Sequence, residues 1–266
     1  MDKPFRVAPD VYVIPTWVTF PEIGTLSFNS FLFTGKEPLL VDTTIGVRSE
    51  EFLQKLSSLI DPSEIRWVWL SHDDIDHVGS LKQILDMAPE AKLAAHNEAI
   101  LRQSLSWKVP MNRVHALAPG HKLEAGERTF HPMRPPLFDN PGTLGFFEES
   151  TKTYFAVDCF GTFVPEAMDD VGGLSESELK EGMTAWATVD SPWCHLVDEG
   201  KFAAVLDEVR RLEPQQVIGA HLPPARGMLE TLLGITKTIP SADPAEVPNH
   251  LEFAEWLEAG YDPSKG

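Results

Sequence analysis

Four side chains that can ligate a metal ion fall within six residues: His72, Asp74, Asp76 and His77. They come directly after a β-rich apolar run over residues 65–70, and a loop leaving a buried strand lets neighbouring side chains converge on one point. Imidazole nitrogens and carboxylate oxygens suit Zn, Fe or Mn, whereas the lack of a CxxC pair argues against structural zinc or an iron–sulfur cluster. A helix cap would explain Asp76 alone, but not two histidines flanking three aspartates. The loop therefore predicts a metal centre.

Strands and helices alternate on both sides of this loop. Strands are expected over residues 11–14, 27–34, 39–42, 65–70, 92–95, 128–133, 144–148, 153–157 and 216–220, and helices over residues 49–60, 79–87, 98–105 and 199–212. The acidic stretch 165–189 is expected to form an exposed helical excursion. Helices interspersed with strands in both halves, without an internal repeat, predict an α/β fold in layers and a single domain.

The composition excludes several classes of protein. The chain has 266 residues, 42% hydrophobic and 23% charged, so it is neither a disordered tail nor a fibre. Its 22 basic and 40 acidic residues give a net charge of −18, which disfavours nucleic acid and anionic membranes as partners. No stretch reaches the ~18 apolar residues of a membrane span. Cys159 and Cys194 form no disulfide framework, and the first residues lack the apolar run of a signal peptide, so we expect a cytoplasmic protein.

The loop at His72 resembles the HxHxDH loop of the metallo-β-lactamase superfamily, which lies at the top of an αββα sandwich. It is most similar to the diiron domain of flavodiiron proteins and to stand-alone oxygen-binding diiron proteins, where a carboxylate replaces the second histidine, as Asp74 does here. Two downstream residues have family-like contexts, Asp158 in YFAVDCFG and His221 in VIGAHLPP. The resemblance covers residues 10–230. It implies a sandwich core over residues 1–235 and a C-terminal extension with a helix over residues 236–266.

One ligand position departs from the family pattern. Where the family has a histidine, this chain has Asp139, which lies 19 residues before Asp158. His131, eight residues earlier near the start of the same predicted strand, is the alternative. The family's ligand is followed by proline after two residues and by a hydroxyl residue after four, and Pro141 and Thr143 reproduce that register. The register favours Asp139.

The resemblance implies two metal ions, with iron favoured and zinc or manganese as alternatives. One ion would take His72, Asp74 and Asp139, the other would take Asp76, His77 and His221, and Asp158 would bridge them. In some family members the histidine matching His77 points away from the metal. Four ionised aspartates would balance two divalent ions, whereas the family pattern has three carboxylates. The extra charge favours hard, higher-valent metal and a lower reduction potential.

Three functions fit this pattern. The family resemblance favours a diiron protein that binds or reduces O₂ or NO. We expect no flavodoxin-like domain after the last ligand, so catalytic reduction would need an external electron donor. The second reading is a binuclear hydrolase acting on an ester, lactone, thioester or amide. In either case no side chain is assigned the catalytic role, and the reacting O₂ or water is expected between the ions. A binding module with a degenerate site is third, and it is disfavoured because seven candidate ligands are retained.

The C-terminal extension has a helical pattern of its own. Within residues 248–261, the side chains of Leu251, Ala254, Trp256 and Leu257 form one apolar face at helical spacing. This face would pack either on its own domain or on a second chain. The hypothesis drawn from it is a homodimer formed through the tail.

Overall fold

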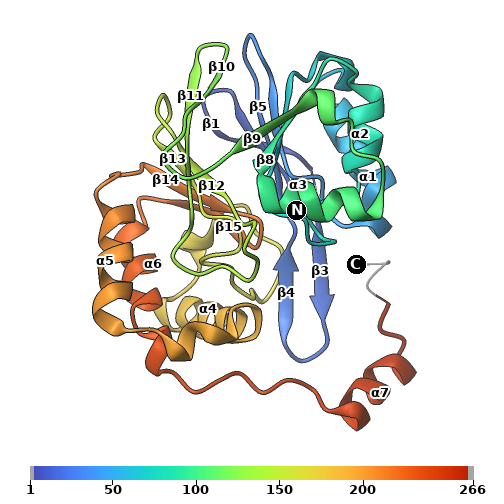
Figure 1. Ribbon diagram of the computed structural model, residues 1–266. Coiled ribbons are helices and arrows are strands. Elements are labelled where there is room, and N and C mark those ends of the chain that lie inside the picture. The colour runs from blue at the N-terminus through green and yellow to red at the C-terminus, as the bar shows by residue number, and fades with distance from the viewer. Residues whose placement is uncertain (1–2, 263–266) are drawn as a thin grey trace.

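Two β-sheets form the inner layers of the computed structural model, which describes residues 3–262 (Figure 1). The first sheet has the order β1-β2-β5-β6-β7-β8-β9, and the second runs in sequence from β10 to β15. The first comprises β1 (Phe5–Ala8), β2 (Val11–Ile14), β5 (Ser30–Phe33), β6 (Leu39–Val41), β7 (Trp67–Leu70), β8 (Lys92–His96) and β9 (Val114–Leu117). The second comprises β10 (Leu123–Ala125), β11 (Arg128–Met133), β12 (Gly145–Glu148), β13 (Thr153–Phe155), β14 (Gln216–Gly219) and β15 (Leu222–Arg226).

Parallel pairing brings the ends of certain strands together. In the first sheet β6, β7, β8 and β9 are parallel, and in the second sheet β13 is parallel to β14. The remaining pairs within the two sheets are antiparallel. The residues that follow β6 and β7 therefore meet at one edge, as do those that follow β13 and β14.

Aromatic side chains fill the space between the sheets. Phe33 and Trp69 from the first sheet meet Phe130 and Phe146 from the second, with ring centroids 4.9 to 5.6 Å apart in the edge-to-face pairs. Along β7, Trp69 faces this inner core, whereas Val68 and Leu70 face the outer helices. Both faces of the strand are buried, which explains its unbroken apolar sequence.

Helices cover the outer faces of both sheets (Figure 1). The first sheet packs against α1 (Ser49–Ser57), α2 (Leu81–Met87) and α3 (Asn97–Ser106) through one apolar cluster. The second packs against α4 (Glu176–Asp190), α5 (Glu199–Arg210) and α6 (Leu229–Thr236) through another. The predicted single-domain αββα sandwich is confirmed.

The strand expected over residues 27–34 is interrupted. The first part belongs to a separate hairpin of β3 (Trp17–Phe20) and β4 (Gly24–Ser27), and β5 begins only at Ser30. Between them, the backbone N–H of Asn29 donates to Ala220 O at 2.8 Å, and its side chain donates to the carbonyls of Gly219 and Leu222. These bonds join the chain at Asn29 to the end of β14 and replace the strand pairing there.

The acidic stretch 165–189 is helical over α4, as predicted, but the predicted exposure was wrong. It contains most of α4, whose side chains of Leu179, Met183 and Ala187 are buried in the core of the second sheet. These three residues are spaced four apart and so share one face of the helix. Glu178 and Glu181 are exposed on other sides of the helix, and such acidic residues hid the apolar face in the composition.

After η6 (Ile239–Ser241) the chain leaves the sandwich. Ile239 is still buried in the core, but α7 (His250–Glu258) contains no buried residue and lies apart at the end of an extended segment (Figure 1). The predicted division at residue 235 stays a prediction, and residues 1, 2 and 263–266 of its two parts lie outside the described residues. No helix within residues 3–262 is both long and apolar enough to cross a membrane.

Candidate metal centre

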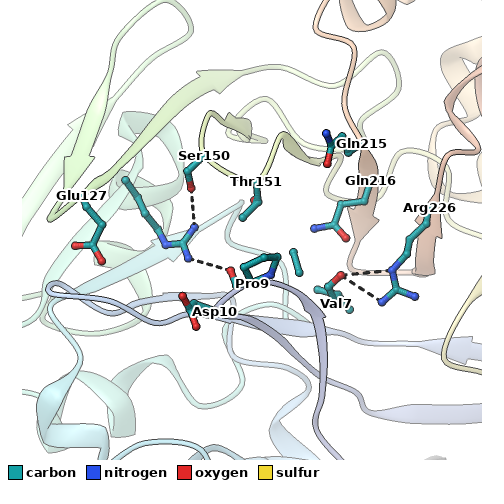
Figure 2. Close-up of a pocket in the computed structure, with 11 residues that line it drawn as sticks. Val7, Pro9, Asp10, Glu127, Ser150, Thr151, Gln215, Gln216 and Arg226 are labelled. Atoms are coloured by element: carbon teal, nitrogen blue, oxygen red, sulfur yellow. Dashed lines mark hydrogen bonds between the residues drawn. The ribbon is translucent and has the colours of Figure 1, made fainter.

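The candidate ligands meet at one end of the sandwich. His72 to His77 follow β7, Asp158 follows β13, His221 follows β14, and Asp139 lies in the loop before β12. The opposite end holds a polar cavity of 470 Å³, where Thr151 and Gln215 precede the same strands β13 and β14 (Figure 2). There the guanidinium of Arg226 donates to Val7 O and pairs with Asp170. The candidate metal ligands thus lie at the end of the sandwich where β7, β13 and β14 end.

A nitrogen-rich group consists of Asp76, His77 and His221, whose ligand atoms lie within 4.8 Å of one another. The Nε2 atoms of His77 and His221 lie 3.4 and 3.2 Å from Oδ2 of Asp76. Against the effect of burial, Asp158 and Asp76 raise the pKa of His221 to about 10. Positive charge is therefore favoured at this position, whether carried by protons or by a cation.

An oxygen-rich group consists of His72, Asp74 and Asp139, again with ligand atoms within 4.8 Å. Nε2 of His72 lies 3.8 Å from Oδ2 of Asp74 and 3.8 Å from Oδ1 of Asp139. Burial and the nearby His77 lower the pKa of His72, so its imidazole is kept neutral, the form that binds metal.

Asp158 lies between the two groups. Its Oδ1 is 3.3 Å from Nε2 of His77 and 3.2 Å from Nε2 of His221, and its Oδ2 is 3.4 Å from Nε2 of His72. Asp158 is only 2% exposed, and neither carboxylate oxygen has a hydrogen-bond partner among the described residues. A buried carboxylate without hydrogen bonds is costly unless a cation compensates it. This orphaned carboxylate fits a centre with one cation on each side.

The far nitrogens of the three histidines are held by neighbouring groups. Nδ1 of His77 is 2.9 Å from Oδ2 of Asp42, and Nδ1 of His221 is 2.7 Å from Ser27 O. Ser71 Oγ is 3.1 Å from Nδ1 of His72 and donates to Asp42 at 2.7 Å. Such contacts orient each ring so that Nε2 points to the centre. Asp42 was not predicted as part of the site, and its only sequence signal is an acid directly after a buried strand.

Asp74 is held from outside by polar side chains that the sequence did not single out. Asn140 Nδ2 donates to Oδ1 of Asp74 at 2.8 Å and to Oδ1 of Asp73 at 3.1 Å. Arg102 donates to Oδ2 of Asp73 at 2.7 Å. Because these bonds occupy Oδ1 of Asp74, its Oδ2 is the oxygen left to face His72.

Asp139 and His131, the two candidates for the ligand position that departs from the family pattern, lie in different parts of the structure. Asp139 is in the oxygen-rich group, with its side chain 22% exposed. His131 lies on β11, where its Nε2 pairs with the exposed Glu149 carboxylate. Burial, a hydrogen bond with Asp74 and the charge of Asp158 raise the pKa of Asp139. The structure therefore brings Asp139, rather than His131, next to the other six candidate ligands.

Aromatic and apolar side chains enclose the nitrogen-rich side. The ring of Trp186 is 4.4 Å from that of His221, and its Nε1 donates to Asp158 O at 3.0 Å. Phe28 packs edge-on against His221 at 5.0 Å. A cavity of 570 Å³ opens beside Asp76, lined by Val18, Phe20, Phe28, Ile45, Gly46, Val47 and Ile75. No motif in the sequence marked Trp186, which lies on α4.

Known proteins match this chain over the sandwich and over the candidate ligands. The family described as "ODP family beta lactamase" matches residues 26–221, which is most of the sandwich and includes all seven candidate ligands. The chain belongs to this family. Together with the relatives and solved structures described next, this match confirms the predicted relationship to the metallo-β-lactamase superfamily and the flavodiiron proteins.

Curated relatives of this ODP-family chain are flavodiiron proteins. It is 32% identical over 142 residues to the flavo-diiron protein FprA2 of Clostridium acetobutylicum, covering 53% of this chain and 35% of that protein. It is 24% identical over 234 residues to the anaerobic nitric oxide reductase flavorubredoxin of Aeromonas hydrophila, covering 87% and 43%. The chain thus spans less than half the length of these relatives.

Solved structures share the fold of the ODP-family chain. Rubredoxin oxygen:oxidoreductase from Desulfovibrio gigas superposes with a TM-score of 0.77 at 16% identity, covering 90% of this chain and 61% of that one. A flavoprotein from Thermotoga maritima gives a TM-score of 0.76 at 21% identity, covering 92% and 63%. At this level of sequence identity, the structural similarity shows that the fold is shared.

Proposed function

We propose that this chain holds two iron ions between its seven candidate ligands and binds or reduces O₂ or NO. Asp158 carries the proposal, because its two orphaned oxygens face different ligand groups. A carboxylate that offers one oxygen to each of two groups has the arrangement that a bridging ligand needs. The names of two relatives, a flavo-diiron protein and a nitric oxide reductase, agree with this chemistry.

In this proposal the two metal sites have different ligand atoms. His72, Asp74 and Asp139 would hold one ion, and Asp76, His77 and His221 would hold the other, with Asp158 shared. Iron held here would supply the binding site for a diatomic molecule and would pass on the electrons that reduce it. The protein directs each imidazole Nε2 toward the centre through contacts of the Nδ1 atoms with Asp42, Ser71 and Ser27 O. Trp186 and Phe28 pack against the His221 ring and exclude water from it. The carboxylate-rich donor set favours iron or manganese over zinc.

We further propose that electrons come from a separate redox protein. The names of the relatives join flavin or rubredoxin to this type of core, as in flavorubredoxin and rubredoxin oxygen:oxidoreductase. A cytoplasmic location agrees with Cys159 and Cys194, which are both buried free thiols. A homodimer formed through α7 agrees with the absence of buried residues on that helix.

Metal-dependent hydrolysis is the second candidate function. The observation that favours it is the apolar cavity of 570 Å³ beside Asp76, which is larger than a diatomic molecule requires. A cavity of this size and lining suits an organic ester, lactone, thioester or amide. The carboxylate-rich donor set argues against it, because added negative charge weakens each ion as a Lewis acid.

Metal analysis of protein purified without oxygen tests the proposal. We expect about two iron ions per chain, and an absorption spectrum that changes on addition of O₂ or NO. The same preparation is assayed for cleavage of chromogenic esters, lactones and thioesters. Two zinc ions, an unchanged spectrum and ester cleavage would contradict the diiron proposal and support the hydrolase.

A further inference from the structure

Asp190, the last residue of α4, lies at the oxygen-rich side of the candidate centre. One carboxylate oxygen from each of Asp139, Asp158 and Asp190 lies within 4.8 Å of the other two. Its position is fixed by the docking of α4. Trp186, one turn earlier, donates to Asp158 O, and Gly182 lies so close to the loop at Phe163 that a Cβ atom would meet the Phe163 carbonyl at 2.3 Å.

Without a cation, the neighbouring carboxylates and the end of the helix make this position unfavourable for a carboxylate, although Ser191 and His221 favour its charge. Asp190 is partly buried beside two other carboxylates, and it occupies the last turn of α4, where the helix dipole is negative. Its hydrogen-bond partner is Ser191, whose Oγ donates to Oδ2 at 3.0 Å. No lysine or arginine among the described residues pairs with it. A cation in contact with Asp190 would reverse all of these repulsions.

The second observation is the buried carboxylate of Asp158. It is 2% exposed, both of its oxygens are without hydrogen bonds in the described structure, and it belongs to the same cluster as Asp139 and Asp190. An acidic cluster on a surface is solvated by water, but this one ends in a carboxylate that water does not reach. The cluster therefore has the properties of a cation site.

We propose that Asp190 is an additional ligand of the oxygen-rich site, which takes a hard cation such as Mn²⁺ or Fe³⁺. This inference rests on the proposed binuclear centre and adds an eighth ligand to it. The site would have one imidazole, from His72, and four carboxylates, from Asp74, Asp139, Asp158 and Asp190. The nitrogen-rich site would have two imidazoles and two carboxylates. Since Mn²⁺ prefers oxygen and zinc accepts nitrogen readily, the two sites differ in the metal they select.

Titration of the metal-free full chain with Mn²⁺ tests this, with unbound Mn²⁺ measured by electron paramagnetic resonance. Asp190→Asn keeps the size of the side chain and removes its charge. We expect the wild type to bind two ions. Asp190→Asn should bind one of them with its affinity weakened on the order of tenfold or more. Glu181→Gln, on the exposed side of the same helix, is the matched control and should bind as the wild type does.

Wild-type affinity at both sites of Asp190→Asn would overturn the ligand assignment while leaving the binuclear centre intact. Failure of the wild type to bind two ions would instead overturn the proposed function, and the inference with it. Thermal unfolding without metal separates ligation from a structural role. Because the substitution removes charge repulsion, the metal-free variant should unfold at the same temperature as the wild type or higher. A lower temperature would mean that Asp190 stabilises the fold itself and would contradict the inference.

Discussion

At the scale of single residues, Asp158 is the side chain on which both halves of the centre depend. It is buried, its oxygens are orphaned, and it is within 3.4 Å of three imidazole nitrogens. Asp158→Ala should leave fewer than two metal ions per chain, because one change removes a ligand from both sites. Elemental analysis measures this, with the exposed Asp86→Ala as control. Two ions per chain in Asp158→Ala would exclude a bridging role.

The variant ligand position gives a second prediction at this scale. Asp139→Ala should lower the occupancy of the oxygen-rich site, because Asp139 lies 3.8 Å from the Nε2 atom of His72. His131→Ala is the matched control, since His131 pairs with Glu149 on β11 and should leave the metal content unchanged. Elemental analysis of both variants decides between them. The reverse result would show that the register drawn from Pro141 and Thr143 is wrong.

The site residues that sequence reasoning missed were brought in by packing. Asp42 approaches His77 because β6 and β7 are parallel neighbours, and Asp190 approaches Asp158 because α4 docks through an apolar face. Neither residue belongs to a local motif, and neither contact can be predicted from the spacing of residues along the chain. The seven candidate ligands, in contrast, follow strand ends in a spacing that resembles a known family. Pattern reasoning therefore reached the ligands but not the groups that surround them.

At the scale of elements, the same distinction holds for strands and helices. The runs 65–70 and 216–220 were predictable because both faces of β7 and β14 are buried and their sequences are largely apolar. The break between β4 and β5 was not, since it depends on hydrogen bonds from Asn29 to residues about 190 positions away. The burial of α4 was missed because acidic residues dominate the composition of the stretch 165–189.

The turn between β12 and β13 gives a prediction for stability against pH. Glu148 is fully buried and accepts hydrogen bonds from the backbone N–H and hydroxyl groups of Ser150 and Thr151. Burial opposes its ionisation, but these bonds hold the pKa of Glu148 below its usual value near 4.5. A lowered pKa means that Glu148 contributes stability above that value and loses the contribution as the pH falls through its folded pKa.

Glu148→Gln should therefore lower the free energy of unfolding at pH 7 by about 2 kcal/mol. The difference from the wild type should shrink as the pH falls through the lowered pKa of Glu148, where the wild-type carboxyl group also becomes neutral. Urea unfolding at several pH values measures both effects. Glu149→Gln is the control, because its exposed side chain pairs with His131 on the surface. An equal loss at pH 7 and at low pH would show that the charge of Glu148 is not responsible.

At the scale of the whole molecule, α7 is the element that the sandwich leaves uncovered. It has nine residues and a capping box between Asn249 and Glu252, yet none of its residues is buried. A helix of this length is marginal in water without packing. Its apolar side chains are open to solvent, with Leu251 72% and Leu257 54% exposed. The ring centroid of Tyr261, just beyond the helix, lies 6.0 Å from that of Phe20 in the β3–β4 hairpin. Since Phe20 lines the apolar cavity at Asp76, this contact places the end of the helix near that cavity.

A second copy of the chain would cover this apolar face, and its removal should separate the copies. We expect the full chain to be a dimer by light scattering and a chain ending at residue 240 to be a monomer, since the core retains its last buried residue, Ile239. Leu251→Ser with Leu257→Ser should also give monomers, because the exposed apolar contact is lost without shortening the chain. Glu255→Gln, on the same helix, should stay dimeric. Monomers for both the full and the shortened chain would reject the dimer.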